Sequence, residues 1–383
     1  MEKILYFDNA ATTFPKPAEV ISEVTSVMRY RCGNPGRSSH KIALAASDAI
    51  YECREKLAGM FGGSPEKLIF TQNATHALNM GIKTVLHRGD HVLISDIEHN
   101  SVIRPVAALA QRGLITYDVY TACEDSGQQL RELMSKLRPE TSMICACHHS
   151  NICNFLLPIR EIGAFCLRKG IVFLVDASQS AGTIPISMEK DNIDLLCAPG
   201  HKGLYGPPGT GFIIYGNRFD DPENLPDTFT EGGNGIRSTE SKMPDFLPER
   251  LEAGTLAVPA IAGLAKGADF VRTFPQNRLY QQECDLYQRM RTNLKTFDRI
   301  RLYGEKSGSI LLFSVSGCDS EVFASALNEY GICVRAGLHC SPLAHRKLGT
   351  PSDGAIRVSF GAFNTEREVN EFCSVTEKLL KQM

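Results

Sequence analysis

The stretch from Ile171 to Gly211 constrains the possible folds of this chain most strongly. It opens with an apolar run, Ile171 to Val175, rich in the β-branched residues that are typical of a buried parallel strand. Asp176 ends that run, and a second short run, Ile193 to Cys197, is followed by a turn that contains Lys202. Because open α/β sheets bind ligands at the carboxyl ends of their strands, we expect Asp176 and Lys202 at one edge of a mostly parallel sheet.

A carboxylate and a lysine at the same sheet edge suit the cofactor pyridoxal 5'-phosphate (PLP). The lysine amine can form a Schiff base with the cofactor, and the carboxylate can keep the ring nitrogen protonated so that the ring accepts electrons. Taken singly, a surface lysine and a helix-capping aspartate are the commoner interpretations of such residues. Gln179 and His201, which stand beside the pair in the sequence, favour the cofactor.

A neighbouring glycine-rich run, Gly206 to Gly211, resembles the start of a phosphate-binding P-loop. That motif requires a lysine and a hydroxyl residue at its end, whereas Phe212 and Ile213 follow here. We therefore interpret the run as a turn that leads into a strand from Phe212 to Tyr215, and we exclude a P-loop nucleoside triphosphatase.

Composition and charge exclude further classes. The chain has 41 basic and 43 acidic residues and a formal net charge of -2, which gives no electrostatic reason to expect a nucleic-acid partner. No apolar run approaches the roughly 18 residues of a membrane span. The first residues, Met1 to Ile4, lack the long apolar region of a signal peptide. Thirteen cysteines, an odd number, favour reduced thiols, so we expect a cytoplasmic enzyme without a membrane partner.

Other predicted strands end in polar residues that we expect at the same edge. The strand from Leu68 to Phe70 leads into Ala74 and Thr75, which open a helix. Free N–H groups and the helix dipole can hold a phosphate there, although an ordinary helix cap needs the same residue types. His99 follows the strand from His91 to Ser95, and such an imidazole can stack on a planar ring, carry protons or serve the structure alone.

The stretch from Met143 to Cys153 is rich in cysteine and histidine and admits two interpretations. Cys145 and Cys147 fall within a predicted strand, where a free cysteine serves as a small apolar residue. Structural zinc sites normally have about two to four residues between paired cysteines and a second matching pair, and no second pair is evident. We expect no metal, and we keep a cysteine-rich zinc or redox protein as the remote alternative. Asn151, at the end of the strand, joins the candidate site residues.

The alternation of strands and helices predicts an α/β fold with a mostly parallel sheet. We expect a large domain over residues 15–260 and a smaller α+β domain over residues 261–383. The smaller domain also includes the N-terminal residues 1–14. In the smaller domain, Cys340 follows a glycine-bearing turn near Arg335 and His339. Nearby cations lower the pKa of a thiol and favour the nucleophilic thiolate. The local sequence alone leaves a catalytic and a structural Cys340 equally open.

Taken together, these motifs resemble those of the PLP-dependent class V aminotransferase-like family, and in particular its cysteine desulfurases. The resemblance covers nearly the whole chain and implies a PLP-dependent transferase of fold type I. The spacing Arg-x-Gly-x-His-Cys is similar to that of the second group of these enzymes. The matching segments, in order, are Asp8–Thr13, Ala74–Thr75, Glu98–Ser101, Ser150–Asn151, Asp176–Gln179, Gly200–Lys202, Glu252–Thr255, Arg335–Cys340, and Arg357 with Phe363–Thr365.

The resemblance implies a role for each candidate cofactor residue. Lys202 would form the Schiff base, Asp176 would pair with the ring nitrogen, and Gln179 would contact the phenolic oxygen. His99 would stack on the ring with Asn151 nearby. The residues that would hold the phosphate are Ala74, Thr75 and His201 of one chain and Thr255 of its partner in a homodimer.

The same resemblance implies the reaction. Arg357 would bind the substrate carboxylate, a task that suits a planar guanidinium, and Asn34 and His40 lie in a segment that borders the site. Cys340 would take sulfur from L-cysteine as a persulfide, leave L-alanine, and pass the sulfur to an acceptor protein, as in iron–sulfur cluster assembly. Lys202 and His99 complete the catalytic set.

Two departures from the family pattern leave alternatives open. Pro199 stands where these enzymes commonly carry a hydroxyl residue that helps to hold phosphate, and the segment from Pro342 to Gly349 is not typical of them. The first departure predicts weaker cofactor binding. The second leaves the sulfur acceptor open, and with it a selenocysteine lyase or another β-eliminating PLP enzyme of the same fold.

Overall fold

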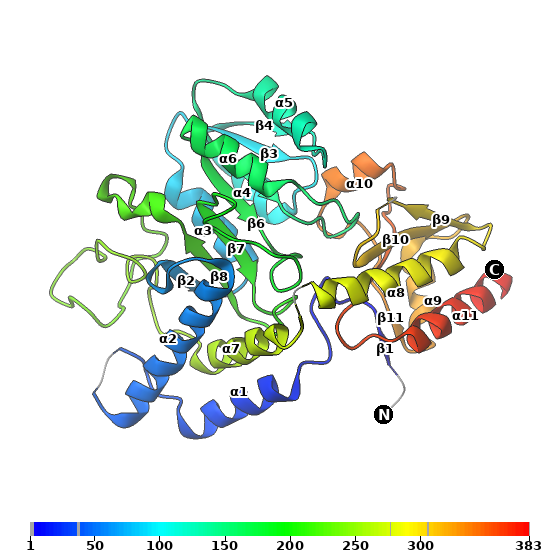
Figure 1. Ribbon diagram of the computed structural model, residues 1–383, viewed down its shortest axis with the longest axis horizontal. Helices are drawn as coiled ribbons and strands as arrows, with labels where there is room; N and C mark the ends of the chain where they lie inside the picture. Colours follow the sequence, from blue (N-terminus) through cyan, green and yellow to red (C-terminus); the bar gives the residue numbers. More distant parts are fainter. Residues whose placement is uncertain (1–3, 37–38, 276, 305, 383) are drawn as a thin grey trace.

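A sheet of seven strands, ordered β2-β8-β7-β6-β5-β3-β4, forms the centre of the larger of two lobes (Figure 1). The computed structural model describes residues 4–36, 39–275, 277–304 and 306–382. Only β8 runs against its neighbours, since it pairs antiparallel with both β7 and β2. The strands are β2 (Leu68–Thr71), β3 (His91–Ser95), β4 (Thr116–Tyr120), β5 (Thr141–Cys147), β6 (Val172–Asp176), β7 (Leu195–Pro199) and β8 (Gly211–Tyr215).

Helices cover both faces of this sheet, which explains why its strands read as continuous apolar runs. In β6, Phe173 packs with one layer of the core and Leu174 with the other, as the two-residue period of a strand requires. The helices of the larger lobe are α1 (Ala18–Tyr30), α2 (Lys41–Phe61), α3 (Ala74–Val85), α4 (Asn100–Gln111), α5 (Ser126–Lys136), α6 (Ile159–Lys169) and α7 (Val258–Arg272).

The smaller lobe is built on a three-stranded antiparallel sheet, β12-β10-β9, with its own apolar core (Figure 1). Its strands are β9 (Ile300–Tyr303), β10 (Ile310–Val315) and β12 (Ile356–Ser359). The N-terminal strand β1 (Leu5–Tyr6) pairs in parallel with β11 (Ile332–Cys333) beside it. The helices of this lobe are α8 (Arg278–Leu294), α9 (Ser320–Asn328), α10 (Pro342–Leu348) and α11 (Glu366–Gln382).

The predicted α/β class with a mostly parallel sheet is confirmed. The strand predicted from His91 to Ser95 has those bounds. The sequence does not indicate α10, because its short run gives little helical periodicity. None of the helices described is both long and apolar enough to cross a bilayer.

Candidate active site

A polar cleft lies at the carboxyl ends of the parallel strands β5, β6 and β7, where the sequence predicted a ligand site. Eight of the predicted cofactor residues line it together, although they come from five separate segments of the chain. The residues that line it are Asn73, Ala74, Thr75, His99, Ser101, Cys147, His149, Asn151, Asp176, Ser178, Gln179, Pro199, His201 and Lys202.

Asp176 and Lys202 bring a carboxylate and an amine to this cleft. Asp176 ends β6 and is buried, and one of its carboxylate oxygens accepts a hydrogen bond from the N–H of Ser178 at 2.9 Å. Burial lowers the pKa of Lys202 to about 8, and the charge of Arg357 acts in the same direction while Asp176 opposes it. The amine of Lys202 is therefore unprotonated in a far larger share of molecules than an exposed lysine near neutral pH, as a nucleophile or proton acceptor must be.

The start of α3 offers an anion site beside these residues. Asn73 caps the helix by accepting from the N–H of His76 at 2.9 Å, so the N–H groups of Ala74 and Thr75 stay without a helical acceptor. Gly211 of β8 permits this arrangement, because a Cβ there would lie 2.6 Å from the backbone carbon of Asn73. Free N–H groups at a helix N-terminus bind phosphate groups well.

His201 faces the same cleft with an unused ring nitrogen. Its Nδ1 is buried and has no hydrogen-bond partner among the residues described. Burial lowers the pKa of His201 to about 4, and the charges of Lys202 and Lys16 act in the same direction, so the ring is neutral at physiological pH. A buried nitrogen without a partner is costly, and a phosphate oxygen at this end of the cleft would satisfy it.

His99 is the N-cap of α4 and has a defined tautomer. Its Nδ1 accepts a hydrogen bond from the N–H of Ser101 at 3.1 Å, so Nε2 carries the proton of the neutral ring. The hydroxyl of Ser101 also lies 2.8 Å from that Nδ1 and 2.7 Å from the hydroxyl of Thr75. Burial lowers the pKa of His99 to about 4. The ring is therefore held in one orientation and is uncharged near neutral pH.

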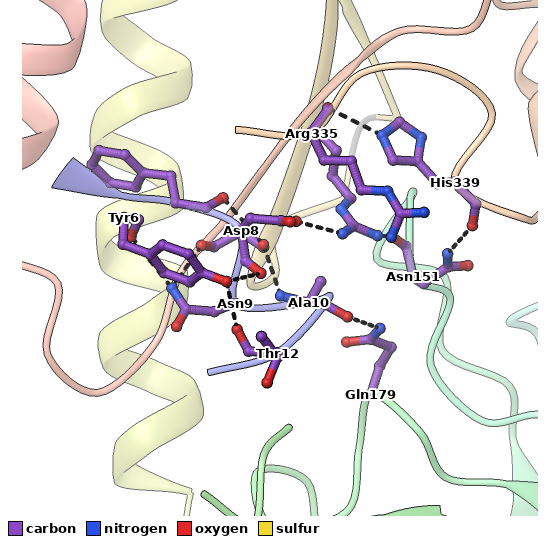
Figure 2. A network of polar contacts seen from close by, with 12 residues as sticks. Tyr6, Asp8, Asn9, Ala10, Thr12, Asn151, Gln179, Arg335 and His339 are labelled. Carbon is purple, nitrogen blue, oxygen red and sulfur yellow. Dashed lines mark hydrogen bonds and ion pairs between the residues drawn. The ribbon is translucent and has the colours of Figure 1, made fainter. Parts of the chain in front are cut away.

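Gln179 and Asn151 connect the cleft to the smaller lobe. The amide of Gln179 donates to the carbonyl oxygen of Ala10 at 2.9 Å, a contact drawn in Figure 2. The amide nitrogen of Asn151 donates to the carbonyl oxygen of His339 at 3.0 Å, and its amide oxygen accepts from the hydroxyl of Ser341 at 2.7 Å. Asn151 thus binds both neighbours of the predicted nucleophile.

Cys340 itself is exposed, unlike Cys145 and Cys147, which are buried in β5. Its carbonyl oxygen accepts from the N–H of Asn100 at 2.8 Å, and Asn100 directly follows His99 of the cleft. The main chain around Cys340 is therefore tied to the rim of the cleft while the thiol stays accessible. The described residues contain no group of three or more histidine, cysteine or acidic side chains arranged to hold a metal ion.

Arg357 of β12 is almost fully buried beside the cleft and forms an ion pair of 2.7 Å with Asp8. One of its terminal nitrogens also donates to the carbonyl oxygen of Asn151 at 3.3 Å, while its Nε–H is buried without a partner in the described ranges. Figure 2 shows Asp8, Asn151, Arg335 and His339 close together where the two lobes meet.

The sequence alone indicates no role for Asp8, Asn73 and Ser101. In the structure, Asp8 pairs with Arg357, and Asn73 and Ser101 line the cleft. Arg335 is half-buried, and its guanidinium forms no ion pair within the described part of the chain. Its charge still lowers the pKa values of His99 and Lys202, although burial is the larger cause for both. The sequence around Arg335 does not indicate whether its guanidinium forms an ion pair.

Besides Cys340 at the rim and Arg357 beside the cleft, three further predicted site residues do not line the cleft of this chain. Asn34, His40 and Thr255 are all exposed. His40 caps α2, since its Nδ1 accepts from the N–H of Ala43 at 3.2 Å. Their roles in binding a cofactor or substrate stay predictions.

Comparison with known proteins gives the family. The model of the family named aminotransferase class-V matches residues 5–372. The chain belongs to this family. It is 30% identical to a probable cysteine desulfurase of Methanothermobacter thermautotrophicus over 98% of this chain and 94% of that protein, and 29% identical to one of Pyrococcus abyssi over 100% and 96%. The resemblance inferred from the motifs is thereby confirmed.

Solved structures agree with that assignment. The apo structure of a cysteine desulfurase from Thermococcus onnurineus NA1 superimposes with a TM-score of 0.89 at 28% identity, over 99% of this chain and 95% of that one. A protein described as NifS-like superimposes with a TM-score of 0.85 at 26% identity, over 100% of this chain and 100% of that one. Class V aminotransferases depend on PLP, and the cleft residues of this chain fit that group. An amine, a carboxylate, a helix N-terminus and an unpartnered imidazole nitrogen all lie around one cavity.

Proposed function

We propose that this protein is a PLP-dependent cysteine desulfurase, which converts L-cysteine to L-alanine and forms a persulfide on Cys340. The observation that carries the proposal is the attachment of an exposed cysteine to the rim of the cleft. Asn151 binds the residues on both sides of Cys340, and Asn100 binds its carbonyl oxygen. An accessible thiol fixed beside a lysine–aspartate pair suits sulfur transfer better than plain elimination.

The cofactor would be held by contacts at both of its ends. Asp176 would face the ring nitrogen, while Ala74, Thr75 and His201 would hold the phosphate. Pro199 ends β7 and lines the cleft, and it adds no hydroxyl to that phosphate site. When bound, PLP supplies an electron sink for the electrons released at the Cα of the substrate.

Lys202 would move the proton of the substrate Cα. Its lowered pKa, about 8, allows the free amine to accept that proton and the ammonium to return it near neutral pH. His99 is neutral, and its proton lies on Nε2, so we propose that it packs against the ring and donates at most one proton from that atom. Gln179, whose amide donates to Ala10 of the N-terminal segment, would contact the phenolic oxygen of the cofactor.

The substrate carboxylate would bind Arg357. The Nε–H of Arg357 has no partner among the described residues, and its Nη2 uses one of two hydrogens on Asp8. The Nε–H and the second hydrogen of Nη2 remain available. Together they form the fork of two parallel donors that suits a carboxylate. Arg335 provides a second positive charge nearby, without an ion-pair partner among the described residues, and would raise the local concentration of the anionic end of the substrate.

The sulfur step balances without an added oxidant. The Cys340 thiolate attacks the sulfur of L-cysteine, the bond between that sulfur and Cβ breaks, and a sulfur–sulfur bond forms on Cys340. Cβ gains a proton and becomes the methyl group of alanine. One L-cysteine and one thiolate thus give one alanine and one persulfide anion, which an acceptor protein would then take up.

We propose a homodimer in which Thr255 of each chain reaches the phosphate of its partner. The exposure of Thr255, Asn34 and His40 supports this arrangement, because none of the three lines the cleft of its own chain. We also propose the division into a large domain and a smaller domain that includes β1. The packing of α7 against α1 and α2 favours moving the boundary from residue 260 to about Arg272. The expected cytoplasmic location stays a prediction.

A product assay tests the proposal. Purified protein loaded with PLP should form equal amounts of alanine and sulfide from L-cysteine in the presence of a reducing thiol. Formation of pyruvate and ammonia would instead indicate a β-eliminating enzyme. Activity with L-selenocysteine but none with L-cysteine would indicate a selenocysteine lyase.

A further inference from the structure

His345 of α10 is a buried histidine that no step of the proposed reaction uses. It is 2% exposed and stands five residues after Cys340, in the segment that departs from the family pattern. Its ring stacks on that of His339, with centroids 5.3 Å apart and an angle of 11° between the planes. This buried, stacked pair of histidines lies next to an exposed thiol, and its hydrogen bonds determine how the two rings are held.

These hydrogen bonds form a chain with a single direction. The Nε2 of His339 lies 3.2 Å from the carbonyl oxygen of Arg335, which only accepts, so His339 carries its proton on Nε2. Its Nδ1 must then accept, and the Nε2 of His345, 3.1 Å away, must donate. The Nδ1 of His345 accepts in turn from the hydroxyl of Thr350 at 2.9 Å. Every ring nitrogen of the pair is satisfied, and each ring is held in one tautomer.

The surroundings keep both rings neutral. Burial lowers the pKa of His339 to about 2 and that of His345 to about 4, and the charge of Arg357 acts in the same direction on both. The hydrogen bond to the carbonyl oxygen of Arg335 raises the pKa of His339, and this effect is smaller than that of burial. A proton added to Nδ1 of His339 would face the Nε2–H of His345, so the hydrogen bond between the two rings requires the neutral form of His339.

The loop that this chain holds has an unfavourable backbone. His339 and Cys340 have φ values of 50° and 57°, and Gly337 has a φ of 98°. Two consecutive residues with side chains in the left-handed region cost about 1–2 kcal/mol each, so other contacts must hold them there. Asn151 and Asn100 hold the main chain, and among the described residues the ring of His339 hydrogen-bonds to Arg335 and His345.

Helix α10 is itself fixed to the larger lobe. The ammonium of Lys347 lies 2.9 Å from the carboxylate of Asp96, at the end of β3, and donates to the carbonyl oxygen of Ala122 at 2.8 Å. His345 therefore projects from a helix that is anchored to the lobe carrying the cleft. It connects this anchored helix to the ring of His339, next to the nucleophile.

We propose that His345 is a positioning residue for Cys340: by binding the ring of His339, it holds the left-handed turn that keeps the thiol at the rim of the cleft. The proposal deepens the proposed function and rests on it for the role of Cys340. The geometry of the loop does not depend on that function, which allows the two to be tested separately.

The test compares three variants of the PLP-loaded protein. His345→Phe keeps a ring of similar shape but cannot donate to His339, whereas His345→Gln restores an amide donor near the position of Nε2. His91→Phe is the matched control, because His91 is a fully buried histidine bonded to Thr141 at the opposite end of the sheet. Thr350→Val, which removes the other end of the chain, replaces His345→Phe if that variant does not fold.

Two measurements decide the outcome. Hydrogen exchange by mass spectrometry should show at least tenfold faster exchange in residues 335–341 of His345→Phe, with no change elsewhere, and His345→Gln should restore most of the protection. With L-cysteine, kcat should fall about tenfold in His345→Phe while KM and cofactor content change less than threefold, and His91→Phe should leave both kcat and loop exchange unchanged.

Other results overturn the inference. Unchanged exchange in residues 335–341 of His345→Phe, or a loss of protection spread over the whole protein, contradicts it. So does a defect that His345→Gln does not relieve. The exchange measurement needs no turnover, so it tests His345 even if the wild-type protein fails to make alanine and the proposed function itself is wrong.

Discussion

Asp8 and Arg357 form a 2.7 Å ion pair although 349 residues separate them in the sequence. The pair joins the N-terminal segment to β12 beside the cleft, and it orients a guanidinium that is almost fully buried. Removing one partner of a buried ion pair leaves the other charge uncompensated, which is strongly destabilising. Asp8 therefore keeps Arg357 charged and in place. The fork that remains on Arg357 is therefore ready for a carboxylate before substrate arrives.

The first prediction concerns this fork. Arg357→Lys should raise KM for L-cysteine about tenfold or more with a smaller change in kcat, because an ammonium cannot make the two parallel hydrogen bonds of a guanidinium. Steady-state kinetics of wild type and variant measure this. Arg335→Lys serves as the comparison: a larger rise of KM there, with Arg357→Lys unaffected, would assign the carboxylate to Arg335.

The second prediction concerns Lys202. Lys202→Ala should lose essentially all turnover, because the amine that anchors the cofactor is also the group that moves the proton of the substrate Cα. Borohydride should attach the cofactor covalently to wild type but not to the variant, as mass spectrometry of the intact protein would show. Normal turnover in the variant would contradict the assignment of Lys202.

The third prediction concerns assembly. Lys202→Ala and Thr255→Asp should each be inactive alone, since the second places a negative charge against the phosphate. Mixed and refolded together, they should recover about a quarter of wild-type activity, because half of the dimers are mixed and each mixed dimer has one intact site. A monomeric protein with full activity, or no recovery on mixing two folded dimers, argues against a shared site.

The fourth prediction concerns stability and pH. Glu283 of α8 is buried, forms no hydrogen bond or ion pair in the part of the chain described, and burial raises its pKa to about 8. Between its ordinary pKa of 4.5 and pH 8, the folded chain keeps a proton that the unfolded chain releases. This group therefore lowers stability progressively as the pH rises through that range.

Glu283→Gln removes that proton equilibrium. It should increase the free energy of unfolding at pH 8 by about 1–3 kcal/mol and change it little at pH 5, as urea titrations at both values would show. Asp285 is exposed on the same helix and offers a matched control, Asp285→Asn, which removes a carboxylate at the surface. A Glu283→Gln protein that is less stable than wild type at pH 8 would indicate an ionised, favourably bound carboxylate.

Some of this architecture could be predicted from the sequence because it depends on local patterns. The apolar run before Asp176 and the turn at Lys202 each predict where a strand ends, and parallel strands place such ends at one edge. The same reasoning brought His99 and Asn151 to the cleft. These residues follow buried strands, and a buried strand can be predicted from the apolar residues of its own segment.

Other features depend on contacts between distant segments. Nothing near Asp8 indicates that it pairs with Arg357, and the single ring of His345 gives no sign that it lies against His339. The segment around Asn151 likewise gives no sign that its side chain binds the loop of Cys340. These interactions arise where the two lobes meet, so they require the tertiary structure rather than a pattern within one segment.

The most direct test of the central claim is single-turnover alanine formation from L-cysteine by wild type and Cys340→Ala, followed by mass spectrometry of the Cys340 peptide. Wild type should form one alanine per site and gain one sulfur on Cys340, while the variant should bind cofactor normally and form almost no alanine. Undiminished alanine from Cys340→Ala, or a persulfide found only on another cysteine, would contradict the account.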